Sequence, residues 1–68
     1  MTQRERVIKY LEDFGSITRA EAFVELGIVE LPARICELER MGYTFKKEPT
    51  FSTNRYGDKV VFTKYSLI

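Results

Sequence analysis

The side chains that most often carry chemistry in proteins are scarce in this chain. It has no histidine and a single cysteine, Cys36. Zinc sites built from cysteine and histidine, histidine-based catalytic triads and an internal disulfide are therefore excluded within the chain. Carboxylates are plentiful, yet no pair of them lies beside a nucleophile or a glycine-rich phosphate loop. We therefore predict that the chain is not an enzyme and that it holds no metal, no cofactor and no small-molecule substrate.

The length limits what the remaining side chains can do. A chain of 68 residues is the size of one small domain, and it buries only about 60% of its unfolded surface. A deep catalytic cavity is not expected at this size. The longest apolar run is three residues, as in Val60–Phe62, which is too short to span a membrane. A lone thiol suits a reducing compartment, so we expect a single cytoplasmic domain over residues 1–68.

Charge is unevenly distributed along the chain. Eleven Lys and Arg against ten Asp and Glu leave a net charge of +1, which by itself indicates no polyanionic partner. Residues 1–41 hold six basic and eight acidic side chains, whereas residues 42–68 hold five basic and two acidic ones. Any anion-binding surface is thus predicted to draw on the C-terminal part.

Two capping boxes predict the first two helices. In Thr2–Glu5 and in Thr18–Glu21, a threonine and a glutamate three residues apart can each satisfy a free amide at a helix start. Gly15 and Gly27 are suited to end these helices in the left-handed conformation. The short segment Ser16–Thr18 between them is predicted to be an extended connector or a strand with a single bridge.

A third helix is predicted to begin near Pro32, which costs no hydrogen bond at a first helical position, and to end at Gly42. Helical spacing predicts the buried faces of all three helices. The predicted core residues are Val7, Ile8, Tyr10, Leu11 and Phe14 in the first helix, Ala22, Phe23 and Leu26 in the second, and Leu31, Ile35 and Leu38 in the third. Opposite the last stripe lie Ala33, Cys36, Glu37 and Arg40, with Arg34 on one flank.

The C-terminal third is predicted to form a β-hairpin. Tyr43–Lys47 and Val60–Leu67 are rich in β-branched and aromatic residues, with Phe45 and Tyr65 as core candidates. Between them, Glu48–Lys59 contains a proline, an asparagine, a glycine and an aspartate, and is predicted to be a long loop. Exposed aromatics in this region, if present, would indicate a partner or dimer surface; they are Phe51, Tyr56 and Phe62.

The run from Thr18 to Tyr43 and the order of the predicted elements resemble the small winged helix-turn-helix domains of bacteriophage and mobile-element proteins. The most distinctive pieces are Ser-Ile-Thr at 16–18, Leu-Gly-Ile at 26–28, Ala-Arg-Ile at 33–35, Leu-Glu-Arg followed by Gly-Tyr at 38–43, and Lys-Tyr-Ser-Leu at 64–67. The resemblance covers nearly the whole chain. It implies an α+β fold with three helices, a short strand after the first and a C-terminal two-stranded wing.

Similarity to that family implies sequence-specific binding of double-stranded DNA by a small transcriptional regulator or an excisionase-like accessory factor. The third helix would lie in the major groove. There Arg34 or Arg40 would pair with guanine, Glu37 would accept a hydrogen bond from cytosine, and Ala33 would touch a thymine methyl. Because one helix reads only a short site, a homodimer or a partner protein is expected.

The basic wing and the start of the second helix are the expected phosphate contacts. The candidates are Thr18, Arg19, Lys46, Lys47, Asn54, Arg55 and Lys59. Each set also has a plainer interpretation: the threonine caps its helix, the lysines protect a sheet edge, and Arg34 and Arg40 pair with Glu37 on a solvated helix face.

A protein-binding winged helix, such as a phage-encoded inhibitor of a host complex, is the alternative function. The near-neutral total charge and the acidic residues around the third helix, Glu30, Glu37 and Glu39, favour it.

Overall fold

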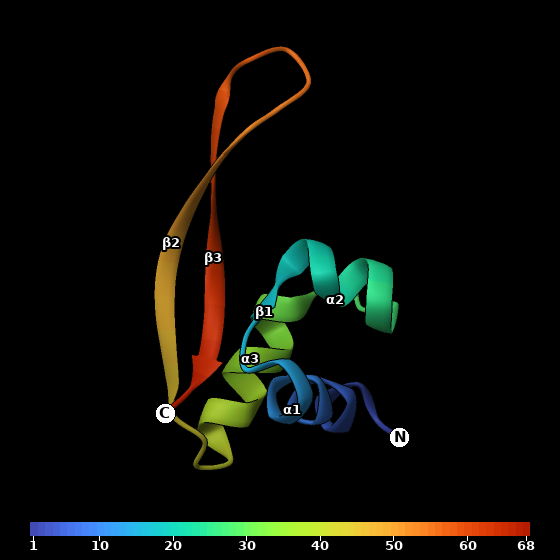
Figure 1. The fold of residues 1–68 in the computed structure, drawn as a ribbon. Coiled ribbons are helices and arrows are strands. Elements are labelled where there is room, and N and C mark those ends of the chain that lie inside the picture. The colour runs from blue at the N-terminus through green and yellow to red at the C-terminus, as the bar shows by residue number, and fades with distance from the viewer.

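The computed structural model describes all of residues 1–68. The elements follow the predicted order: α1 (Gln3–Phe14), β1 (Ile17–Thr18), α2 (Arg19–Leu26), α3 (Leu31–Arg40), β2 (Phe45–Thr53) and β3 (Lys59–Leu67). The three helices lie on one side of the lower part of the β2–β3 hairpin, whose upper part extends beyond them (Figure 1). The molecule is therefore elongated, with extents of 38 × 22 × 21 Å.

Both predicted capping boxes are formed. At the start of α1, the amide of Glu5 donates to Thr2 Oγ1 over 3.2 Å, and the amide of Thr2 donates to Glu5 Oε1 over 3.1 Å. At the start of α2, the corresponding distances between Thr18 and Glu21 are 3.2 and 3.0 Å. Gly15 ends α1 with a φ of 85°, a conformation that favours glycine.

Removing the second capping hydroxyl is expected to destabilise the fold measurably. Thr18→Ala leaves the amide of Glu21 without its acceptor, and loss of such a cap costs about 1 kcal/mol. Urea denaturation followed by circular dichroism measures the change. Thr18→Ser is the control, because it keeps the hydroxyl and loses only a methyl group. Equal losses in the two variants would show that the cap does not stabilise the helix.

The turn between α2 and α3 is held by the backbone. Gly27 adopts a φ of 68°, and the amide of Ile28 donates to the carbonyl of Ala22 over 3.0 Å. Pro32 lies in the first turn of α3, as predicted, and Glu30 at the helix start makes no side-chain cap. After α3, the amide of Tyr43 returns to the carbonyl of Leu38 over 3.1 Å, and the chain then enters β2.

The strands form one antiparallel sheet in the order β1-β3-β2. The short strand predicted after α1 is confirmed, and it adds a third strand to the hairpin because Ile17 pairs with Tyr65 and Thr18 with Lys64. Strand β3 thus lies between β1, which follows the first helix, and β2. Its pairing places the start of α2 beside the wing.

The prediction of a long loop over Glu48–Lys59 is wrong. Strand β2 continues to Thr53 and pairs with β3 along its whole length, so that the turn is limited to residues 54–58. Pro49 lies within the strand, opposite Thr63. A proline is tolerated there because β2 is an edge strand and forms a ladder on one side only.

Ten apolar side chains form the core, and they come from every element. Phe45 and Tyr65 are buried as predicted, as are Leu31, Ile35 and Leu38. The prediction that Phe14 and Phe23 are core residues is wrong, since they are 69% and 61% exposed. Phe14 ends α1 and lies against the ring of Tyr10 at the surface, with the centroids 4.6 Å apart.

The error at Phe23 has its own cause in the shortness of α2. This helix has eight residues and buries only Ala22 fully, with Leu26 half-buried four residues later. Phe23 lies about 100° around the helix from Ala22 and so points out of the core.

Tyr10 is expected to make the stability of the fold depend on pH at high pH. Burial and a hydrogen bond from its phenol to Glu21 Oε2, 3.2 Å long, raise the pKa of Tyr10 above its ordinary value of 10.0. A group whose pKa is higher in the folded state than in the unfolded state stabilises the fold fully at pH values below its unfolded-state pKa. This stabilisation is lost as the pH rises through the folded-state pKa. Denaturation at a series of pH values should show that Tyr10→Phe removes this loss. A wild-type curve parallel to that of the variant would contradict the prediction.

Candidate functional site

The outer side of α3 is open to solvent. Leu31, Ile35 and Leu38 turn inward and are at most 1% exposed, whereas Cys36 and Arg40 on the opposite side are exposed. The hairpin therefore leaves this side of the helix free. Arg40 makes no hydrogen bond or ion pair with another side chain, so its guanidinium is available to a partner.

Arg34 is held within the protein. Its Nη1 donates to Gln3 Oε1 of α1 over 3.0 Å, and its Nη2 donates to Glu37 Oε2 over 3.2 Å. The Nε atom lies 3.0 Å from the other oxygen of Glu37. With 27% of its side chain exposed, Arg34 joins α3 to α1. The plainer interpretation thus describes Arg34 and Glu37, and it does not describe Arg40.

The two lysines at the base of the wing are also paired. Lys46 Nζ lies 2.8 Å from Glu48 Oε1 in the same strand, and Lys47 Nζ lies 3.2 Å from Glu39 Oε1 of α3. The hydrogen bond and the charge of Glu48 raise the pKa of Lys46, and Lys46 in turn lowers the pKa of Glu48. The Lys47 pair ties the wing to α3.

Five cations of the α2, α3 and wing region have no carboxylate within ion-pair distance, and we call them the open cations. Arg19 begins α2 and Arg40 ends α3, while the other three lie on the hairpin. Three of the five basic side chains of the C-terminal part are therefore free, two of them at or beside the tip of the wing and the third beside the start of α2. The open cations are Arg19, Arg40, Arg55, Lys59 and Lys64.

The turn at the tip of the wing is ordered by Asn54. Its Oδ1 accepts hydrogen bonds from the amides of Tyr56 and Asp58 over 2.9 and 3.0 Å. The amide of Asn54 donates to the carbonyl of Asp58 over 2.9 Å. The side chain of Asn54 is thus used inside the turn, and the turn presents Arg55 and Tyr56 to solvent, with Tyr56 83% exposed.

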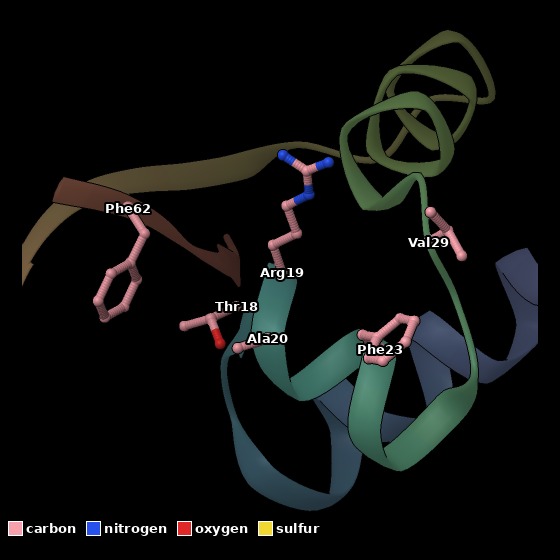
Figure 2. A pocket seen from close by; sticks show the side chains of 6 residues that line it. All are labelled: Thr18, Arg19, Ala20, Phe23, Val29 and Phe62. Carbon is pink, nitrogen blue, oxygen red and sulfur yellow. The ribbon is translucent and has the colours of Figure 1, made fainter. Parts of the chain in front are cut away.

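A shallow apolar depression of about 480 Å³ separates α2 from the wing. Phe23 and Val29 lie on one side of it and Phe62 of β3 on the other, while Arg19 extends from the start of α2 (Figure 2). The hydroxyl of Thr18 at its floor is occupied by the capping bond to Glu21. The depression combines an open cation with exposed aromatic surface.

Comparison with known families bears directly on this arrangement. A family model described as a winged helix-turn-helix domain matches residues 2–68. The chain belongs to the winged helix-turn-helix family. Winged helix-turn-helix domains are typically DNA-binding rather than enzymatic, and membership therefore indicates DNA binding in general. A comparison with curated proteins and a comparison with solved structures each gave no significant match.

In this winged helix-turn-helix domain, no helix is both long enough and apolar enough to cross a bilayer. The helix-turn-helix pair is α2 and α3, and the wing is β2 with β3. The predicted site residues accordingly fall on three neighbouring parts of the domain: the start of α2, the outer and flanking sides of α3, and the wing.

Sequence reasoning missed Lys64 as a site candidate. It is an open cation on β3, and its strand partner is Thr18, so it lies next to the start of α2. The signal that would have found it is the pairing of β1 with β3, which joins residues far apart in the sequence. The depression lined by Phe23, Val29 and Phe62 was missed for the same reason.

Proposed function

We propose that this winged helix-turn-helix domain binds duplex DNA in a sequence-specific manner, with α3 in the major groove and the wing on the backbone. It would act in the cytoplasm as a small phage-type transcriptional regulator or an excisionase-like accessory factor, with residues 1–68 as one domain. The observation that carries the proposal is the set of open cations, which lie at the start of α2, at the end of α3 and along the wing.

Base reading is assigned to the outer side of α3. Arg40 has a free guanidinium that can pair with guanine, and the small side chain of Ala33 suits a thymine methyl. Glu37 would accept from cytosine, but it now accepts from Arg34. A base contact by Arg34 would likewise require release of Gln3 and Glu37. Arg40 is therefore the strongest candidate for base contact in this helix.

Phosphate binding is assigned first to the open cations of the wing. Arg55 and Lys59 lie at or beside the tip, beyond the helices, and each phosphate that they neutralise would release counterions. Lys46 and Lys47 would first have to leave their carboxylates. Exposed pairs of this kind contribute about 0–1 kcal/mol, so the exchange costs little. Asn54 supports the wing by ordering its turn.

A second phosphate position is proposed at the start of α2. Arg19 extends from the start of α2 at the edge of the depression (Figure 2), and Lys64 lies beside Thr18 on the neighbouring strand. The partial positive charge of a helix start favours an anion at the same place. Thr18 contributes by fixing the helix start, since its hydroxyl is already used by the cap.

A fluorescence anisotropy titration on duplex DNA at two salt concentrations tests the proposal. We expect micromolar or tighter binding to a specific site. If the four open cations other than Arg40 contact phosphate, the logarithm of the affinity should fall with that of the salt concentration with a slope of about −3.6, at about −0.9 per contact. No binding at low salt would overturn the proposal.

The apolar depression favours a second candidate function, which is binding of a protein partner. Phe23 is 61% exposed and lines this depression, where an apolar side chain of a partner could contact it. Phe23→Ala would then abolish capture of the partner, and Arg40→Ala would leave it intact. If instead Arg40→Ala abolishes binding to DNA and Phe23→Ala leaves it intact, the first function is supported.

A further inference from the structure

The groove between α1 and the end of α3 has an apolar floor that no other part of the chain covers. It has a volume of about 420 Å³ and is lined by ten residues. Its apolar members include Ile8, Met41 and Tyr43, of which Met41 is 60% and Tyr43 40% exposed. The site of the proposed DNA contacts does not use this surface.

The charged residues of the groove divide into two that are satisfied within the chain and two that are not. Glu5 accepts the amide of Thr2 in the capping box, and Lys9 Nζ lies 3.0 Å from Asp13. Arg4 and Glu12 also line the groove, are exposed, and make no hydrogen bond or ion pair. The groove is therefore left with one free cation and one free anion.

The spacing of these two charges on α1 is symmetric about Ile8. Arg4, Ile8 and Glu12 follow one another at intervals of four residues, which places them along one side of the helix. The two charges are about 12 Å apart along the axis, with the apolar side chain halfway. If a second α1 packs antiparallel across Ile8, Arg4 of each copy faces Glu12 of the other.

We infer that this groove is the contact surface for a second copy of the chain. The two copies are related by a two-fold axis near Ile8, with reciprocal Arg4 to Glu12 pairs on either side of the apolar contact. A two-fold interface requires such self-complementarity, and the stripe on α1 provides it without any change in the fold. Dimer formation can be tested without DNA, because the mass of the protein in solution reports it directly.

The expected dimer is weak in free solution. Helix α1 has 12 residues and is about 18 Å long, so that the interface lies at the small end of specific interfaces. Dissociation is expected in the micromolar range or weaker. The reciprocal pairs are exposed at the rim, and the dimer should therefore weaken as salt is added.

Charge reversal with sedimentation velocity tests the inference. The wild type is expected to sediment as a dimer at high concentration. Arg4→Glu and Glu12→Arg should each raise the dissociation constant roughly tenfold or more, because each places two like-charged contacts in the interface. An equal mixture of the two single variants should form a heterodimer, and the double variant should regain the homodimer.

These variants are suited to the test because neither substitution is expected to destabilise the fold. Arg4→Glu adds an acidic residue to the first turn of α1 and Glu12→Arg a basic residue to its last turn, and both changes favour the helix. Glu25→Arg on α2 is the matched control, with the same charge change on a residue outside the groove, and it should dimerise like the wild type. A wild type that stays monomeric up to millimolar concentration overturns the inference. So does a dimer that is insensitive to both reversals.

Discussion

Ile35→Ala is expected to remove a large part of the stability of the fold. Ile35 is 1% exposed and lies in the middle of the inner side of α3, where the helix meets the common core. Truncating a buried isoleucine to alanine costs about 2–5 kcal/mol. A domain of this length holds roughly 3–10 kcal/mol in all. Urea denaturation followed by far-ultraviolet circular dichroism should show a large fall in the midpoint.

Val24→Ala is the matched control for this variant. Val24 is also a β-branched residue in a helix, but it is 75% exposed. Its truncation should change the free energy of unfolding by less than about 0.5 kcal/mol. Similar losses at both positions would mean that the inner side of α3 does not carry the core.

The helices could be predicted from the sequence because their signals are local. A capping threonine and its glutamate are three residues apart, and the glycine that ends each helix follows directly. The stripe of Leu31, Ile35 and Leu38 depends only on helical spacing, and all three are buried as predicted. These features need no knowledge of the tertiary structure.

The hairpin was harder to predict because its pairing is not local. Pro49 indicates a loop when the strand order is unknown, and it is compatible with β2 only because that strand lies at the sheet edge. The contact of β1 with β3 joins Ile17 to Tyr65. No turn signal in the sequence indicates that pairing. Phe23 was assigned to the core because it is hydrophobic, but the short helix α2 buries only the side that carries Ala22 and Leu26.

The sequence predicts which basic residues lie on α3 and on the wing, but not which of them are free to bind a partner. The positions of these residues along the predicted elements place them there, and the structure agrees. Whether a cation is free depends on contacts such as that of Arg34 with Gln3, 31 residues away, and that of Lys47 with Glu39 on another element. Such contacts follow from the fold, so the sequence alone could not separate the open cations from the paired ones.

Replacing three open cations at once is expected to have the largest effect on DNA binding. The variant Arg19→Ala, Arg55→Ala, Lys59→Ala removes proposed phosphate contacts at the start of α2 and at the wing tip. Each lost contact reduces the salt slope by about 0.9 and weakens binding roughly eightfold at 0.1 M salt. Together they should lower the affinity by about two to three orders of magnitude and the slope by about 2.7. Fluorescence anisotropy titrations over a range of salt concentrations measure both quantities.

A second variant separates contact from net charge. Arg6→Glu, Lys9→Ala lowers the net charge by the same three units, but both residues lie on α1, outside the proposed DNA contacts. Long-range attraction to DNA falls equally in both variants, because it depends on the total charge. Any further loss in the first variant must therefore come from short-range phosphate contacts. Equal losses and equal slopes in the two variants would show that the open cations do not mark the DNA-binding surface.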